Sequence, residues 1–384
     1  MLHGGGPTAV LNASLAGVVE ACRAEPSIAA LYGAERGVEG LLGGAIVNLS
    51  AEDPVIWEDI ARAPGSALGS SRRRIADADY QQMLATLGRL GVAWVLANGG
   101  NGTMEMALGL HHAARSAGAN VTVVGIPKTI DNDLAGTDHT PGYASAGRFF
   151  ASCLRDIGAD NRALPGIAVL EVLGRNAGWL AAASTLARRG PEDPPHLTYF
   201  PERPLPFESL AADVDRVYRK LGRVVVSVCE GQLDENGEPF GADVRVSSRA
   251  PLALNLAHTL AQRLTAALKI PARSEKPGLF GRSCAALASE IDRIEARNCG
   301  AAAVRGALAG RGGHMVSIQR NPGSSYTPSY NFTPLEEVAG RERLFPGNWL
   351  PASPEDDLPA FRAWALPITG EIPSYMNLRR VRIF

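Results

Sequence analysis

The stretch that decides the fold is VTVVGIPKTIDNDLAGTD, residues 121–138. Its first part is a continuous apolar run, which is typical of a parallel strand buried on both faces. Its second part is a polar loop that carries three aspartates beside a lysine. In open α/β sheets, ligands bind at the loops that follow the carboxyl ends of the strands. The stretch therefore predicts a buried strand that leads directly into a binding site.

Three more apolar runs, at residues 92–97, 167–172 and 224–228, have the same character. Helix-like segments lie between such runs, for example residues 12–24 and 81–90. This alternation predicts an α/β fold of the doubly wound type. The first glycine-rich turn arrives at Gly4, so the strand expected before it is nearly absent.

The composition of the 384 residues fits an ordinary globular protein with room for two domains, since 46% are apolar and 20% charged. The formal net charge of -1 gives no sign of a nucleic-acid partner or an acidic membrane partner. The five cysteines form no CxxC pair, which favours a reducing compartment over disulfides or zinc. No apolar run approaches a membrane span and no signal-like start is present, so we expect a cytoplasmic protein without membrane contact.

Two glycine-rich turns have the pattern of phosphate-binding loops. Gly4–Thr8 precedes a predicted helix, and Gly99–Thr103 follows the predicted strand 92–97 and opens another helix. Glycine lets backbone N–H groups approach a phosphate closely, and a helix N-terminus favours anions. A third turn, Leu68–Arg74, ends in three arginines that could contact phosphate or form a solvated basic face. Each turn alone could be a plain structural turn.

The polar loop itself carries residues suited to phosphoryl transfer. Asp131 and Asp133 occupy alternate positions, so one can reach a metal while the other reaches a hydroxyl. Lys128 and Thr129 supply a cation and a hydroxyl for a transferring phosphoryl group. Nearby cations are expected to keep Asp131 ionised at neutral pH. The alternative is a polar loop stabilised by asparagine and aspartate turns.

The run PKTIDNDLAGTDHTPGYASA, residues 127–146, resembles the catalytic loop of the phosphofructokinases. Six other segments resemble family motifs in the expected order: GGPTAVLNASLAG, LGSSR, GGNGTMEMA, EVLGRNAGWLAAAS, VVVSVCEG and ARSEKPGLFGRS. The chain is most similar to the bacterial branch with GGPTxVxNASLAG and PKTIDND motifs. The resemblance implies two doubly wound domains with the active site in the cleft between them. It implies a phosphoryl-donor domain of residues 1–142 with 283–345, and a sugar-phosphate domain of residues 143–282 with 346–384. It also implies a homodimer or homotetramer whose active sites take residues from a neighbouring subunit.

The resemblance implies a glycolytic enzyme in which Asp131 is the general base that takes the proton from the 1-hydroxyl of fructose 6-phosphate. The further catalytic residues are Thr129, Lys128 and Arg72. The donor-binding residues are Gly5, Gly100, Asn101, Gly102, Thr103 and Arg72. The sugar-phosphate residues are Thr129, Asp131, Gly174, Arg175, Glu230, Arg273 and Arg282. The cofactor is Mg²⁺, held with the help of Asn101 and Asp133.

The phosphoryl donor is a choice between ATP and pyrophosphate. Pyrophosphate users usually carry an aspartate after the asparagine, where it excludes a nucleotide, and this chain has Gly102. Lys128 is, in contrast, typical of pyrophosphate users. Steric and charge exclusion set such specificity, so this reasoning favours ATP and keeps pyrophosphate as the alternative.

Other functions stay open on the sequence. Leu279 and Gly281 stand where ATP-dependent members often have histidine and glutamine, so another phosphosugar such as sedoheptulose 7-phosphate is a possible substrate. A non-catalytic sensor of phosphosugar or nucleotide is a further alternative. NAD kinases and diacylglycerol kinases share a similar glycine turn, but the TIDND run favours a phosphosugar enzyme. His139, beside the loop, is expected to be structural.

Overall fold

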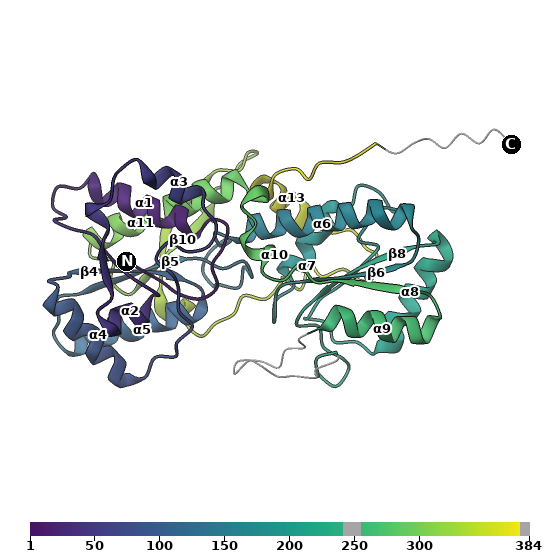
Figure 1. Ribbon diagram of the computed structural model, residues 1–384, viewed down its shortest axis with the longest axis horizontal. Helices are drawn as coiled ribbons and strands as arrows, with labels where there is room; N and C mark the ends of the chain where they lie inside the picture. The colour runs from purple at the N-terminus through teal and green to yellow at the C-terminus, as the bar shows by residue number, and fades with distance from the viewer. Residues whose placement is uncertain (241–254, 377–384) are drawn as a thin grey trace.

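The structure is a computed structural model that describes residues 1–240 and 255–376, and its two main β-sheets lie side by side (Figure 1). The first sheet has the order β1-β4-β5-β10-β11. Its strands are β1 (Leu2–His3), β4 (Trp94–Gly99), β5 (Thr122–Pro127), β10 (His314–Arg320) and β11 (Pro328–Pro334). All neighbours are parallel except β10 and β11. The two-residue β1 pairs with β4 through Leu2 and His3.

Helices cover both faces of the first sheet (Figure 1). One face carries α1 (Leu11–Arg23), α3 (Ile56–Arg62) and α11 (Glu290–Leu308). The other face carries α2 (Val38–Gly43), α4 (Asp77–Arg89), α5 (Asn101–Ser116) and the short α12 (Leu335–Val338). A small antiparallel pair, β2 (Tyr32–Ala34) and β3 (Ile46–Asn48), lies outside the main sheet.

The second sheet is parallel throughout and has the order β7-β8-β6-β9. Its strands are β6 (Ile167–Val172), β7 (Leu197–Tyr199), β8 (Val224–Cys229) and β9 (Ala272–Glu275). One face packs on α6 (Tyr143–Ala163), α7 (Trp179–Ser184) and α13 (Pro359–Thr369), and the other on α8 (Phe207–Leu221) and α9 (Leu256–Leu268). Within the described residues, no helix combines the length and apolarity that a membrane crossing requires.

Strand β6 explains why the apolar runs are continuous. Ile167 and Val169 lie in the core beneath α8 and α9, whereas Ala168, Leu170 and Val172 lie in the core beneath α6. Both faces of the strand are therefore buried, as the sequence predicts for a parallel sheet between two helical layers. The doubly wound α/β fold is confirmed, with the other predicted strands shifted by one or two residues at their ends.

The chain passes between the two sheets more than once. It leaves the first sheet at α6, returns through α10 (Phe280–Ser283) to α11, and reaches α13 on the second sheet after β11. The strands of each sheet fall within the ranges expected for one domain. The limits themselves, 1–142 with 283–345 and 143–282 with 346–384, stay a prediction, and residues 377–384 lie outside the described part.

Helices α1 and α11 approach each other closely because glycine faces backbone at their crossing. A Cβ atom on Gly17 would collide with the carbonyl oxygen of Arg297, and one on Gly300 would collide with that of Ser14. No side chain fits at either position. This contact fixes α11, which carries two carboxylates that hold the segment after the catalytic loop.

We expect Gly17→Ala to lower the free energy of unfolding by about 1–3 kcal/mol, because overpacking forces the two helices apart. Gly88→Ala is the matched control, since a Cβ atom at this exposed position of α4 meets nothing within 4 Å. Chemical denaturation followed by circular dichroism measures both. A Gly17→Ala variant as stable as the control would contradict the close packing.

Candidate active site

The candidate site is formed by loops at the carboxyl ends of strands from both sheets. Strand β1 leads into Gly4–Gly6, β4 into Gly100 and Asn101, and β5 into residues 128–133. From the second sheet, Arg175 follows β6 and Glu230 follows β8. The charges of both residues act on Asp131, so the ends of the two sheets face one another across this loop.

Lys128 ties the first glycine loop to the catalytic loop. Its buried Nζ donates hydrogen bonds to the carbonyl oxygens of Gly4, at 2.9 Å, and Gly6, at 2.7 Å. Burial lowers the pKa of Lys128 to about 8, although the negative charge of Asp131 opposes this shift. Two of the three ammonium protons therefore bind backbone, and the charge remains beside Asp131.

Gly6 marks the point where two arginines converge. A Cβ atom on Gly6 would lie 3.0 Å from Nη1 of Arg282 and 3.3 Å from Nη2 of Arg72. Burial and the neighbouring charge of Arg72 lower the pKa of Arg282. Like charges held this close favour an anion between them, and guanidinium groups suit phosphate. The glycine allows both groups to reach the loop.

The arginine turn is fastened to the first glycine loop. The Gly5 amide donates to the carbonyl of Ser71 at 2.9 Å, and the Ser70 hydroxyl donates to the Gly5 carbonyl at 2.6 Å. This bonding places Arg72 at the site, whereas Arg73 turns away and pairs with Asp79 of α4 at 2.9 Å. Gly5 itself has a φ of 80°, which favours glycine.

The second glycine loop has the predicted geometry, since Gly100 caps α5 and the helix begins at Asn101. Gly102 therefore lies in the first turn of the helix. Thr103 points back into the structure, because Cβ atoms on Gly4 or Gly99 would collide with its Oγ1. Its side chain thus packs the two glycine loops together.

The pair of Asn101 and Asp133 fits a divalent cation. Asn101 Nδ2 donates to Asp133 Oδ2 at 3.0 Å, and the remaining oxygens, Asn101 Oδ1 and Asp133 Oδ1, are buried without a partner. Burial, with the negative charges of Asp131 and Glu342, raises the pKa of Asp133 to about 7. Mg²⁺ prefers such oxygens and completes its shell with water and substrate phosphate. Among the described residues, no cluster of three or more His, Cys, Asp or Glu side chains is arranged to hold a metal ion.

Asn132, between Asp131 and Asp133, shapes the backbone of the loop. Its φ of 56° is in the left-handed region, where asparagine is tolerated better than most residues. Its buried Oδ1 accepts a hydrogen bond from the Thr140 amide at 3.0 Å, and the Thr140 hydroxyl donates to the Thr129 carbonyl at 2.7 Å. The Asp131 amide donates to Thr129 Oγ1 at 3.1 Å, so Thr129 shapes the loop as well.

The charge on Asp131 is set by a balance that the sequence does not reveal. Burial raises its pKa, Arg175, Lys128 and Arg72 oppose this rise, and the negative charge of Glu342 adds to it. The cations expected from the sequence are present and favour the ionised form, although burial raises the pKa more than they lower it. That Asp131 is ionised at neutral pH stays a prediction. A raised pKa strengthens a carboxylate as a base.

The predicted sugar-phosphate residues of the second sheet also meet. Gly174, with a φ of 116°, accepts hydrogen bonds on its carbonyl from the Cys229 thiol and the Gly231 amide. This turn brings Arg175 to Asp131 and Glu230. Burial and the charge of Asp131 raise the pKa of Glu230 to about 7, while Arg175 opposes the shift.

Arg273 is not brought to this cluster within one chain. It lies on the edge strand β9 with an exposed side chain, and its Cα pairs with that of Ala168. Arg273 therefore lies beside the start of β6, whereas Arg175 follows the other end of that strand. The contacts of Arg282 are with the cluster around Gly6, so the two arginines of the predicted pair lie apart.

Glu342 contributes charge to the candidate active site, although no sequence motif predicts it. Along the chain it lies between α12 and α13. Its backbone forms an isolated β-bridge with Leu134, and its carboxylate accepts a hydrogen bond from Asn176 Nδ2 at 2.7 Å. Its charge reaches Asp131 and Asp133. No motif marks it, because it is a single acid in a loop distant along the chain.

The comparisons agree with this geometry. The family described as Phosphofructokinase matches residues 1–307. The pyrophosphate–fructose 6-phosphate 1-phosphotransferase of Rhodospirillum rubrum is 35% identical over 392 residues, covering 99% of this chain and 96% of the relative. The sulfofructose kinase of Alkalicoccus urumqiensis is 32% identical and covers 94% and 92%.

Solved structures give the same result. A pyrophosphate-dependent phosphofructokinase from Marinobacter aquaeolei aligns with a TM-score of 0.87 and 30% identity, covering 98% of this chain and 93% of that chain. Sequence motifs, the arrangement of two sheets and full-length similarity thus point to one family. The chain is a phosphotransferase of the phosphofructokinase family.

Proposed function

We propose that this enzyme transfers a phosphoryl group from pyrophosphate to the 1-hydroxyl of fructose 6-phosphate, with Asp131 as the general base and with Mg²⁺. The observation that carries the donor is that relatives matching nearly the whole chain are mostly named for pyrophosphate. An ATP-dependent relative matches a smaller share. The ATP preference drawn from Gly102 is therefore not favoured, and the pyrophosphate alternative replaces it.

The absence of a side chain at Gly102 is only weak support for ATP as the donor. A glycine removes a group that would exclude a nucleotide, but it supplies no contact that would bind one. Affinity needs favourable contacts as well as the absence of a clash. Lys128 and Arg72 concentrate positive charge at the Gly5–Gly6 loop, and a small, highly charged donor such as pyrophosphate complements such a compact cluster.

The proposed reaction needs positioning and positive charge more than covalent chemistry. Asp131 accepts the proton of the sugar hydroxyl, whose oxygen attacks the phosphorus atom. Inorganic phosphate leaves as the new ester forms. Lys128 and Arg72 offset the charge on the donor, Arg282 binds the sugar phosphate, and Arg175 offsets charge between donor and sugar. Mg²⁺, held with Asn101 and Asp133, would neutralise further charge on the phosphate oxygens.

The acceptor has one alternative with a specific observation behind it. The sulfofructose kinase relative covers most of the chain, and Leu279 and Gly281 replace the histidine and glutamine found in many ATP-dependent members. Arg282 could bind a sulfonate or a phosphate. A non-catalytic sensor is not supported, because the relatives reported above are named as enzymes.

We further propose a homo-oligomer in which Arg273 serves the site of a neighbouring copy. Its exposed position on an edge strand, apart from Arg282, supports this role. Arg282 then holds the sugar phosphate from within the chain, and Arg273 holds it from outside.

The donor proposal predicts turnover with pyrophosphate, fructose 6-phosphate and Mg²⁺, and far less with ATP in its place. Release of inorganic phosphate from pyrophosphate, or of ADP from ATP, measures turnover with fructose 6-phosphate and with sulfofructose or sedoheptulose 7-phosphate as alternative acceptors. Turnover with ATP but not with pyrophosphate would overturn the assignment of pyrophosphate as the donor. Activity only with an alternative acceptor would overturn the proposed sugar and keep the donor.

The two aspartates should fail in different ways. Asp131→Asn removes the base and should lower kcat by about 10²–10⁴-fold, with little change in the KM of the sugar phosphate. Asp133→Asn should mainly raise the Mg²⁺ concentration needed for half-maximal rate. Steady-state kinetics at several Mg²⁺ concentrations separate the two. Near wild-type turnover of Asp131→Asn would remove its assignment as base.

Arg273→Ala should raise the KM of fructose 6-phosphate by about tenfold or more, as expected for a lost charged hydrogen bond. If Arg273 serves a neighbouring copy, co-refolding Arg273→Ala with Asp131→Asn creates intact composite sites. In random dimers about a quarter of the wild-type activity should return. Recovery absent from the mixture would show that each site uses its own Arg273.

A further inference from the structure

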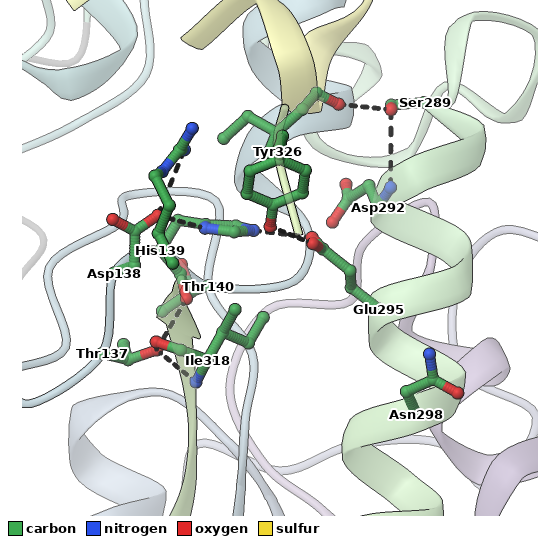
Figure 2. A network of polar contacts seen from close by, with 12 residues as sticks. Thr137, Asp138, His139, Thr140, Ser289, Asp292, Glu295, Asn298, Ile318 and Tyr326 are labelled. Carbon is green, nitrogen blue, oxygen red and sulfur yellow. Dashed lines mark hydrogen bonds and ion pairs between the residues drawn. The ribbon is translucent and has the colours of Figure 1, made fainter. Parts of the chain in front are cut away.

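A buried network of polar contacts surrounds residues 137–140, which follow the predicted catalytic loop in the chain (Figure 2). At its centre is His139, which is completely buried. Its Nδ1 lies 2.8 Å from Asp138 Oδ2 and its Nε2 lies 2.6 Å from Glu295 Oε2. An ionised carboxylate only accepts hydrogen bonds, so both ring nitrogens carry protons when Asp138 and Glu295 are ionised. The geometry therefore calls for an imidazolium between two carboxylates.

Other groups orient these carboxylates. The Tyr326 hydroxyl donates to Glu295 Oε1, Trp364 Nε1 donates to Asp138 Oδ1 at 3.1 Å, and Arg320 Nη2 lies 3.3 Å from Asp138 Oδ2. These residues come from the loop before β11, from α13 and from β10. Every oxygen of Glu295 and Asp138 thus has a described partner, which a structural or functional network requires in a low-dielectric interior.

The network connects to the catalytic loop through one residue. Thr140 follows His139 in the chain, and its amide and hydroxyl hold Asn132 and Thr129. On the other side of His139, the Asp138 amide and the Thr137 hydroxyl bind Ile318 of β10. A displacement of His139 would therefore reach the loop that carries Asp131 and Asp133.

Helix α11 supplies a second anchor one turn away. Asp292 accepts from the Gly142 amide at 2.8 Å and from the Ser145 amide and hydroxyl at 2.9 and 2.5 Å. Asp292 and Glu295 are three residues apart and lie on one face of the helix, as this spacing requires. Asp292 holds the start of α6, and Glu295 holds His139.

We propose that His139 is a positioning residue for phosphoryl transfer, whose imidazolium, clamped between Asp138 and Glu295, fixes the loop that bears Asp131 and Asp133. The proposal rests on the proposed function insofar as Asp131 acts in the reaction. The His139 side chain is fully buried and both its ring nitrogens are bonded to carboxylates, so its effect falls on the orientation of the reacting groups. Misplacement of a reacting group by an ångström can cost on the order of a hundredfold in rate.

The protonation state of His139 supports the geometry. Burial alone would lower its pKa, but the charge of Glu295 and the hydrogen bonds to Asp138 and Glu295 raise it to about 9. A raised pKa means that the charge is present at neutral pH and is lost as the pH rises through about 9. Among the described residues, the charged or titratable groups that face the ring or its partners include Asp138, Glu295, Asp292, Arg320, Arg343, Cys299, Tyr326 and Tyr330.

The test is Glu295→Gln, which keeps the shape and removes one carboxylate charge. The pKa of His139 then falls, and the ring becomes neutral at a lower pH. We expect kcat to drop by about tenfold at pH 8 with both KM values within about twofold of wild type. As the pH falls to 6 and His139 regains its proton, the ratio of wild-type to variant kcat should shrink. Asp133, Glu230 and Lys128 titrate in both proteins, so the ratio isolates His139.

Tyr326→Phe is the matched control, because it removes a hydroxyl from the same network and leaves all charges in place. Its kcat should stay within about twofold of wild type at every pH. A Glu295→Gln ratio that does not change with pH would show a merely structural role and overturn the proposal. So would an effect on KM alone.

A second measurement needs no active variant. In ¹⁵N spectra of the wild-type histidines, with the His139 signals assigned by their loss in His139→Gln, the ring should be doubly protonated at pH 7.5. A neutral ring there would overturn the clamp. The kinetics use whichever donor, pyrophosphate or ATP, the wild type accepts. A wrong donor or an active Asp131→Asn variant would therefore overturn the proposed function without deciding the role of His139.

Discussion

The buried ammonium of Lys128 is the interaction on which the arrangement of the site depends. It lies between the carbonyls of Gly4 and Gly6 on one side and Asp131 on the other, and so connects the end of β1 to the end of β5. A buried charge is tolerated only when it is paired and hydrogen-bonded. The glycine loop, the lysine and the aspartates must consequently be placed together, because removal of one leaves the others desolvated and unpaired.

The same requirement extends across the two sheets. Arg175 and Glu230 come from the second sheet, yet their charges act on Asp131 of the first. Behind the loop, Trp364 of α13 bonds Asp138, and Arg343 bonds the carbonyls of Thr137 and Asp138 while its guanidinium lies 4.2 Å from the Trp179 ring centroid. The catalytic loop is therefore held from both halves of the molecule, although it belongs to the first sheet.

Much of the fold could be predicted because its signals are local. The run 167–172 is apolar except for Glu171 and coincides with β6, and the turn at Gly100 opens α5 as its residues indicate. Strand β7 has three residues within the proline-rich stretch 191–206 and gives no such signal. Some residues of the site could also be predicted, because Asp131, Asp133 and Asn101 lie in short sequence motifs, and the structure brings the three together.

What could not be predicted depends on distant parts of the chain. Burial, the largest influence on the pKa of Asp131, is a property of the assembled structure. Glu295 lies 156 residues from His139 and Glu342 comes from an unmarked loop, so no spacing connects either to the catalytic loop. Gly102 shows a further limit, because a missing side chain reveals what is not excluded and leaves open what is bound.

The order of strands in the first sheet has a consequence for synthesis of the chain. Strand β10 pairs with β5, but the entire second sheet is encoded between them. During translation β5 is therefore made long before its neighbour, and its open edge is a template for pairing with other chains. Until β10 emerges, this edge of the first sheet has no strand to pair with, and the newly made chain is most exposed to aggregation during that interval.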